Sequence, residues 1–157
     1  MGLEIEKKFL VDKDLILKDT YQKCYRYSII SQGFLSTNKD KIVRIRTSDG
    51  KGYITIKGSG FLSHAEYEYQ IPVSDASGLL GMCGQTIDKK RYRIPYGSHI
   101  WEVDFFLGEN EGLVIAELEL QEIDEEFEIP SWVTKDVTGD KRYYNNNLIQ
   151  NPFKNWK

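Results

Sequence analysis

The sequence contains few of the residues that commit a small protein to a disulfide, zinc or histidine-based site. Its 157 residues include two cysteines, Cys24 and Cys83, which are too few for a disulfide framework and fit no zinc-binding spacing. The two histidines, His64 and His99, stand singly at predicted strand starts, and we expect neither to bind a metal or act in catalysis. The chain is long enough to bury the core of one domain, which we expect to span residues 1–157.

Long apolar runs and a strong charge of one sign are also missing. The 21 basic and 24 acidic residues give a net charge of −3, which provides no general reason to bind nucleic acid or an anionic membrane. No apolar stretch approaches the ~18 residues of a membrane span, and the N-terminus lacks the apolar run of a signal peptide. We therefore expect a cytoplasmic protein with no nucleic-acid partner and no membrane partner.

What the sequence does contain is alternation of apolar and polar residues, which is typical of strands. β-Branched and aromatic residues are frequent in these segments, and short glycine-containing turns between several of them favour antiparallel pairing. The alternation predicts eight strands, over Leu3–Val11, Tyr25–Ser36, Lys41–Ser48, Gly52–Lys57, Glu66–Val73, Gln85–Tyr96, Ile100–Leu107 and Leu113–Glu122. Short helices are predicted at Asp12–Lys18, Ser74–Met82 and Asp140–Ile149.

Charged residues occupy one face of most of these predicted strands. In the first strand Glu4, Glu6 and Lys8 share a face, and seven of the eight strands show a comparable charged face. An antiparallel sheet with one face in water explains such a pattern simply. However, the charges are sorted by sign, since Arg44 and Arg46 form a purely basic face whereas several other strands are nearly purely acidic.

Eight strands are also enough to close a barrel. If the charged faces point inward, the interior must hold water, metal and a polyanion, because burying unpaired charge is very costly. Alternation alone does not decide which face lies inside, so a lipocalin-like barrel with an apolar interior remains an alternative.

Eight segments resemble, in chain order, the motifs of one protein family. They are EIEKK (4–8), SQGFLS (31–36), VRIR (43–46), TIKG (55–58), AEYEYQIP (65–72), KKRYRI (89–94), WEVDFFLGENEGLVIAELEL (101–120) and DVTGDKRYYNNNL (136–148). Together they cover nearly the whole chain, which resembles the CYTH-like superfamily, the triphosphate tunnel metalloenzymes. The resemblance implies a mainly β (α+β) fold. It would be a closed eight-stranded antiparallel barrel with charges inside, a few helices outside and a C-terminal helix.

Members of this family bind triphosphate compounds in the tunnel together with Mg²⁺ or Mn²⁺, and most of them hydrolyse these compounds. The resemblance therefore implies that cations from several strands surround the substrate, because guanidinium and ammonium groups suit phosphate oxygens. The residues assigned to triphosphate binding are Lys8, Arg44, Arg46, Lys57, Lys89, Arg91 and Arg93.

The resemblance also implies one or two Mg²⁺ or Mn²⁺ ions, and such hard cations prefer oxygen ligands. The residues assigned as metal ligands are Glu4, Glu6, Glu117 and Glu119. A metal can activate the attacking water and neutralise the leaving group, while a carboxylate can accept the proton of the water. The residues assigned to catalysis are Lys8, Lys89, Glu66, Glu68 and Asp104, and their spacing does not choose among the three carboxylates.

The expected reaction is hydrolysis of inorganic tripolyphosphate to pyrophosphate and phosphate, because the short chain shows no added surface for an adenine or thiazolium ring. A thiamine triphosphatase, a class IV-type adenylate cyclase and a non-catalytic polyphosphate-binding module remain alternatives. Phe34 stands where many relatives have a tyrosine, which puts any mechanism that uses that hydroxyl in doubt. Tunnel relatives can dimerise, but no exposed stripe in the sequence commits this chain to a homodimer.

Overall fold

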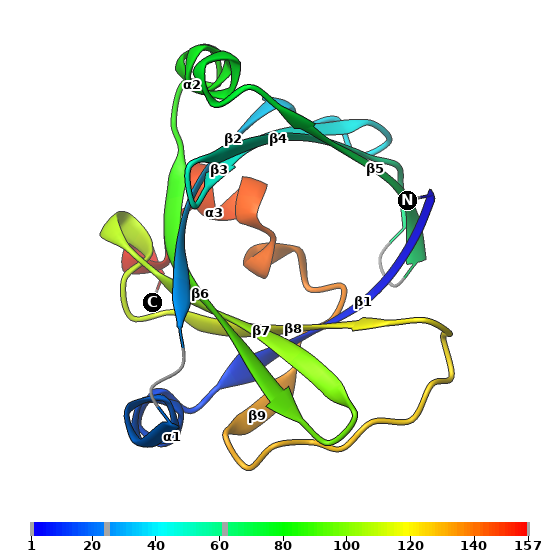
Figure 1. Cartoon of the computed structure of the whole chain (residues 1–157), viewed down its shortest axis with the longest axis vertical. Helices are drawn as coiled ribbons and strands as arrows, with labels where there is room; N and C mark the ends of the chain where they lie inside the picture. The colour runs from blue at the N-terminus through cyan, green and yellow to red at the C-terminus, as the bar shows by residue number, and fades with distance from the viewer. Residues whose placement is uncertain (1, 24–25, 61–62, 157) are drawn as a thin grey trace.

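Eight antiparallel strands close into a barrel in the computed structural model of the chain, seen end-on in Figure 1. The structure describes residues 2–23, 26–60 and 63–156. The barrel strands are β1 (Gly2–Val11), β2 (Tyr27–Ser36), β3 (Ile42–Ser48), β4 (Lys51–Lys57), β5 (Ser63–Ile71), β6 (Ile87–Tyr96), β7 (His99–Phe106) and β8 (Val114–Leu120). They follow the order β5-β4-β3-β2-β6-β7-β8-β1, and β1 pairs with β5 to close the ring. The expected eight-stranded antiparallel barrel is thus confirmed.

A ninth strand, β9 (Val133–Asp136), lies outside this ring. It pairs with the far end of β1, where Phe9 lies opposite Asp136, whereas β5 pairs with the beginning of β1. The sequence analysis did not predict β9, because four residues without apolar alternation give no strand signal.

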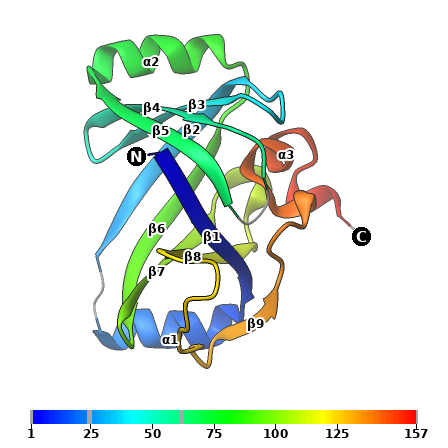
Figure 2. The ribbon, with the colours of Figure 1, turned by 90° about the vertical axis from the view of Figure 1, so that its right-hand side faces the viewer.

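Two helices cover the barrel from outside, α1 (Lys13–Lys23) at one end and α2 (Val73–Met82) at the other (Figure 2). The first helix therefore runs beyond the predicted Asp12–Lys18. The second packs directly on the barrel wall, since a Cβ atom added to Gly52 would lie only 2.5 Å from the Cβ atom of Ala76. None of the described helices combines the length and the apolar character needed to cross a membrane.

The C-terminal helix predicted over Asp140–Ile149 forms only in part. The segment instead forms a 3-10 turn, η2 (Lys141–Tyr143), and a short helix, α3 (Asn145–Gln150), separated by the extended Tyr144. Asparagine has a low helix propensity, and three asparagines begin α3. In addition, Tyr143 is buried in the core while Tyr144 lines the barrel interior, so the two side chains require a break between them. Two further 3-10 turns are η1 (Gly108–Asn110) and η3 (Phe153–Asn155).

Most of the apolar core lies on the outer side of the barrel wall, and a smaller part closes one end of its interior. One cluster packs Phe9, Trp101 and Leu118 against Ile16 of α1 and Trp132 of the segment before β9. A second cluster lies under the C-terminal segment and contains Ile87, Phe106, Leu113, Ile115, Val137, Tyr143 and Leu148. Ile87, Phe106 and Ile115 share strand faces with Lys89, Asp104 and Glu117, so this cluster lies on the inward faces at one end of the barrel. Because the outward faces in the first cluster are covered by helices and loops, the charged faces of the same strands must point inward. This arrangement excludes a lipocalin-like apolar interior.

The three tryptophans all have packing roles. Trp101 is fully buried and Trp132 is 4% exposed, with ring centres 5.6 Å apart in an edge-on contact. Trp156 packs edge-on against Tyr143 and Phe153 near the C-terminus. None of these three rings lines the interior cavity.

Candidate active site in the barrel interior

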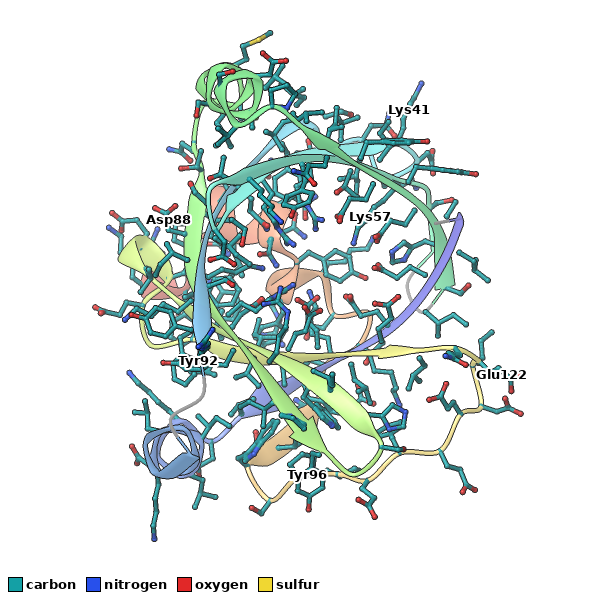
Figure 3. All side chains as sticks on the ribbon, viewed as in Figure 1. Lys41, Lys57, Asp88, Tyr92, Tyr96 and Glu122 are labelled. Atoms are coloured by element: carbon teal, nitrogen blue, oxygen red, sulfur yellow. The ribbon has the colours of Figure 1, made fainter. Side chains whose placement is uncertain are left out.

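The barrel encloses a cavity of about 660 Å³ that all eight barrel strands line, and every one of them except β2 contributes charged side chains. Figure 3 shows Lys57 pointing into the ring, whereas Asp88 and Glu122 lie outside it. The predicted site residues that line the cavity are Glu4, Glu6, Lys8, Arg44, Arg46, Lys57, Glu66, Glu68, Lys89, Arg91, Arg93, Glu117 and Glu119. Strand register brings the two ends of the chain together here, since Glu6 lies opposite Glu119 and Lys8 opposite Glu117.

One wall of the cavity is strongly basic. Arg46 donates from Nε to Oε1 of Gln32 at 2.9 Å, and burial together with the nearby charges of Arg44 and Arg91 lowers the pKa of Arg46 to about 9. Burial likewise lowers the pKa of Lys89 to about 7, although the carboxylate of Asp104 opposes that shift. Cations crowded in this way destabilise one another, so a bound polyanion would relieve their repulsion.

Asp104 lies behind this basic wall rather than in the cavity. Its side chain is 1% exposed, and its oxygens accept from Arg91 Nε at 2.7 Å, from Arg91 Nη2 at 2.8 Å and from Lys89 Nζ at 2.8 Å. Arg91 Nη2 also donates to Oε1 of Glu117 at 2.5 Å. Both oxygens of Asp104 are therefore engaged by cations. This placement favours a role in positioning Arg91 and Lys89 over the predicted role as proton acceptor.

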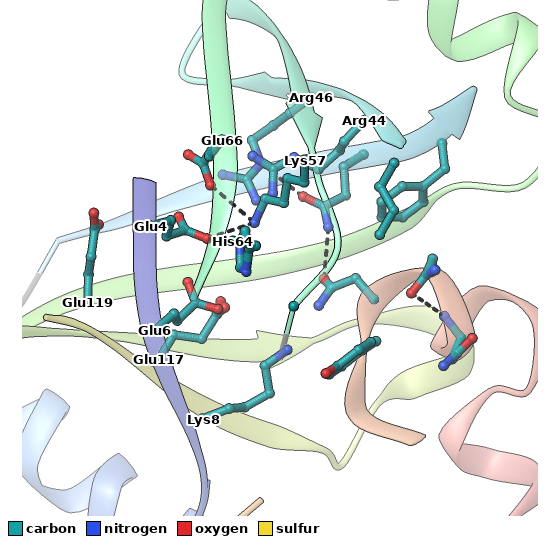
Figure 4. A pocket seen from close by; sticks show the side chains of 18 of the residues that line it. Glu4, Glu6, Lys8, Arg44, Arg46, Lys57, His64, Glu66, Glu117 and Glu119 are labelled. Carbon is teal, nitrogen blue, oxygen red and sulfur yellow. Dashed lines mark hydrogen bonds and ion pairs between the residues drawn. The ribbon is translucent and has the colours of Figure 1, made fainter. Parts of the chain in front are cut away.

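An acidic corner faces the basic wall, where β1 and β5 close the barrel (Figure 4). Glu4 Oε1 lies 2.7 Å from Nε2 of His64 and 3.1 Å from Lys57 Nζ, and Lys57 Nζ lies 3.3 Å from Oε2 of Glu66. Burial would raise the pKa of Glu4, but hydrogen bonds with His64 and Glu66 and the charge of Lys57 lower it well below its ordinary value. Burial and the hydrogen bond with Glu4 raise the pKa of Glu66 to about 7.

The donor atoms in this corner fit a divalent cation. One ligand atom from each of Glu4, His64 and Glu66 can be chosen so that all three lie within 4.8 Å of one another. Glu66 Oε2 is buried and accepts no hydrogen bond from the described residues. Carboxylate oxygens with one imidazole nitrogen are ligands that Mn²⁺ accepts, and the carboxylates alone suit Mg²⁺.

The other predicted metal ligands line the same cavity but are not part of this compact group of ligand atoms. Burial and the neighbouring charge of Glu117 raise the pKa of Glu6 well above its ordinary value. Glu119 is more exposed, and burial and the charge of Glu4 raise its pKa. Within the part of the chain that the structure describes, the compact group of potential ligands therefore contains Glu4 alone of the four predicted carboxylates.

The C-terminal segment supplies site residues that the sequence analysis missed. Asn145 Oδ1 accepts from Gln32 Nε2 at 2.8 Å and from Lys89 Nζ at 2.9 Å. The ammonium of Lys8 lies 5.3 Å above the ring of Tyr144. Figure 1 shows α3 and the chain before it inside the outline of the barrel, so this segment covers one of its mouths. The match of RYYNNNL to the family motif was the sequence feature that pointed to this segment, but it did not indicate which of its residues contact the cavity.

The sequence analysis expected no role for His64, and it gave no sign that His64 lies in the cavity beside Glu4. A lone histidine in the sequence has no spacing partner, and its partner Glu4 lies 60 residues away along the chain. The two residues meet because β1 and β5 close the barrel in a register that places Glu4 opposite His64.

The raised pKa of Glu66 predicts a pH-dependent stability. Folding raises this pKa from 4.5 to about 7, so the folded protein retains a proton that the unfolded chain releases. The free energy of unfolding should therefore contain a contribution that falls as pH rises through this window. Glu66→Gln should reduce the decrease of the free energy of unfolding with pH. The reduction should be smaller than the shift in pKa alone implies, because solvent screens a partly exposed group. Chemical denaturation in the presence of a chelator, between about pH 5 and about pH 8, measures both slopes, and equal slopes would contradict the assignment.

Comparisons with known proteins agree with this site. A model of the CYTH domain matches residues 2–150. The chain is 47% identical over 160 residues to an inorganic triphosphatase of Acetivibrio thermocellus, covering 100% of this chain and 99% of the relative. It is 35% identical over 152 residues to an inorganic triphosphatase of Nitrosomonas europaea, covering 92% and 95%. A crystal structure of an inorganic triphosphatase superposes with a TM-score of 0.63 at 28% identity, over 95% of each chain. With its inward charged faces and this match over nearly its full length, the chain belongs to the CYTH domain family.

Proposed function

We propose that this protein is a cytoplasmic, metal-dependent triphosphatase that hydrolyses inorganic tripolyphosphate to pyrophosphate and phosphate. The observation that carries the proposal is the opposition, within one cavity, of a basic wall and an acidic corner. The likeness to relatives named as inorganic triphosphatases points to the same reaction.

The basic wall suits a triphosphate chain, which carries roughly four negative charges near neutral pH. Arg44 Nη2 donates to Thr55 and lies 3.3 Å from Glu68, whereas its buried Nε has no hydrogen-bond partner among the described residues. An unpaired buried donor costs free energy, so Arg44 Nε is a ready donor for a phosphate oxygen. The triphosphate-binding set of the proposal is Lys8, Arg44, Arg46, Lys57, Lys89, Arg91 and Arg93.

The acidic residues have two roles in the proposal. Glu4, Glu6, Glu117 and Glu119 would hold Mg²⁺ or Mn²⁺, which when bound supplies an activated water and charge neutralisation at the leaving pyrophosphate. In the reaction the water oxygen attacks the terminal phosphorus while the bond from that phosphorus to the bridging oxygen breaks. Glu66 or Glu68 would accept the proton of the water, and Glu68 is the one that stands outside the compact group of potential metal ligands.

Two observations bear on the alternatives. Phe34 lines the cavity, so the proposed reaction uses no hydroxyl at that position. The three tryptophans pack in the core or on the C-terminal segment, so none of them stacks a base in the cavity. The packing of the tryptophans favours an inorganic substrate over a nucleotide.

The test is phosphate release by the purified protein. Tripolyphosphate, ATP, thiamine triphosphate and pyrophosphate are compared, each with Mg²⁺, with Mn²⁺ and with a chelator. We expect metal-dependent release that is fastest from tripolyphosphate, because that substrate needs only the charged tunnel. Tight binding of tripolyphosphate without release from any substrate would identify a polyphosphate-binding module instead.

A further inference from the structure

We propose that His64 is a direct ligand of the divalent metal in the tunnel, and that its nitrogen shifts the preference of this site from Mg²⁺ toward Mn²⁺. This inference rests on the proposed function only in placing a divalent cation in the tunnel. It goes further because it assigns a nitrogen ligand to a site for which the sequence predicted carboxylates alone.

The first argument is placement. His64 begins the inward face of β5 and lies directly opposite Glu4 where the barrel closes, so the two side chains share one face. Nε2 of His64 is 2.7 Å from Oε1 of Glu4, and each side chain is 11% exposed. In the metal-free protein Nε2–H donates this hydrogen bond to Glu4; in the tautomer with the proton on Nδ1, the metal ion would take the place of that proton between the Nε2 lone pair and the carboxylate.

The second argument is the spacing of the ligand atoms. Ligand atoms of Glu4, His64 and Glu66 lie within 4.8 Å of one another. Two ligands that each bind an ion at ~2.2 Å are at most about 4.4 Å apart. Neighbouring ligand atoms at right angles around such an ion are about 3.1 Å apart, so binding requires small rotations of the three side chains around the ion, and their rotatable bonds allow this.

The third argument is that the corner already attracts positive charge. The ammonium of Lys57 lies 3.1 Å from Oε1 of Glu4 and 3.3 Å from Oε2 of Glu66. The same Oε2 atom is buried without a hydrogen bond from the described residues, so its lone pairs are available to a cation. A divalent ion bound here would compete with Lys57, whose flexible ammonium can turn toward the phosphate chain.

The nature of the ligand determines which metal benefits. Mg²⁺ is a hard cation that strongly prefers oxygen, whereas imidazole nitrogen is a good ligand for first-row transition metals. A neutral histidine beside two carboxylates therefore strengthens Mn²⁺ binding more than Mg²⁺ binding.

Pulsed electron paramagnetic resonance of the Mn²⁺-loaded full-length protein, without substrate, tests the assignment directly. We expect a ¹⁴N coupling that is replaced by the ¹⁵N pattern when histidine alone is labelled, and that disappears in His64→Gln. The matched control is His99→Gln, because His99 pairs with Glu125 away from the cavity and should leave the coupling unchanged. Absence of a histidine coupling in the unmodified protein, or its persistence in His64→Gln, would overturn the proposal.

Calorimetric titration with Mn²⁺ and with Mg²⁺ separates ligation from a purely positioning role. His64→Gln should weaken Mn²⁺ binding by ~10-fold or more and Mg²⁺ binding by clearly less. An equal loss for both metals would show that His64 acts only by orienting Glu4. Circular dichroism of the variant establishes that it is folded. The spectroscopy uses no substrate, so its result does not depend on catalysis. A histidine coupling in a protein that releases no phosphate from any substrate would support this inference and refute the proposed function.

Discussion

Glu4→Gln is expected to reduce metal-dependent release of phosphate from tripolyphosphate by at least ~100-fold. Loss of a residue that merely supports a metal ligand costs ~10–100-fold, and a direct ligand should cost more. Glu4 is one of the four predicted metal ligands and also belongs to the compact group of ligand atoms with His64 and Glu66. The fold should persist, because a glutamine side chain has nearly the same shape and its carbonyl oxygen can still accept from Lys57, which now donates to Glu4 at 3.1 Å.

Steady-state phosphate release at saturating Mg²⁺ or Mn²⁺, together with thermal unfolding, checks this expectation. Glu119→Gln should cost less activity, because Glu119 is exposed and stands outside the compact group. Glu122→Gln is the matched control, since Glu122 lies outside the barrel in Figure 3 and its loss should change nothing. Unchanged rates in both Glu4→Gln and Glu119→Gln would remove the metal assignment.

Asp104→Asn is expected to have the largest effect on stability, lowering the free energy of unfolding by about 3–5 kcal/mol. Asp104 is 1% exposed and pairs with two buried cations, Lys89 and Arg91. An asparagine leaves both cations without their main counter-charge, and the penalty for an uncompensated buried charge is large. Deprotonation of Lys89, whose pKa is already lowered to about 7, should moderate the loss above that pH.

Urea denaturation of Asp104→Asn measures this effect. The matched control is Asp88→Asn, because Asp88 lies on the exposed side of the same strand as Lys89. Asp88→Asn should be nearly neutral. Added tripolyphosphate should recover part of the lost stability in Asp104→Asn, since a ligand that binds only the folded state stabilises it and a polyanion restores counter-charge to Lys89 and Arg91. A loss of stability no larger than that of Asp88→Asn would contradict the positioning role of Asp104.

Much of the barrel follows from local sequence patterns. Alternation along each strand assigns Glu4, Glu6 and Lys8 to one face, and the opposite parity assigns Ile5 and Phe9 to the other, as the structure has them. Sorting of charges by sign correctly favoured a charged interior. The boundaries near the C-terminus were predicted poorly, because the path of 140–150 depends on where Tyr143 and Tyr144 find space and not on helix propensity.

The individual roles within the site depended on distances that alternation cannot provide. Asp104 and Glu102 share a parity on β7, yet Asp104 is fully enclosed by cations while Glu102 lines the cavity. Asn145 reaches Lys89 from 56 residues away, through a segment whose local pattern indicated only a packed helix.

The sequence alone therefore determined the strands, the residues on each face and the family motifs, because side-chain parity and composition are local properties. Alternation did not decide which face lies inside the barrel, whereas the family motifs implied a charged interior, which the tertiary structure has. Only the tertiary structure decided that Glu4 meets His64 and that Asn145 contacts Lys89. These outcomes depend on ring closure and strand register, which join residues far apart in the chain and are set by the packing of the whole barrel.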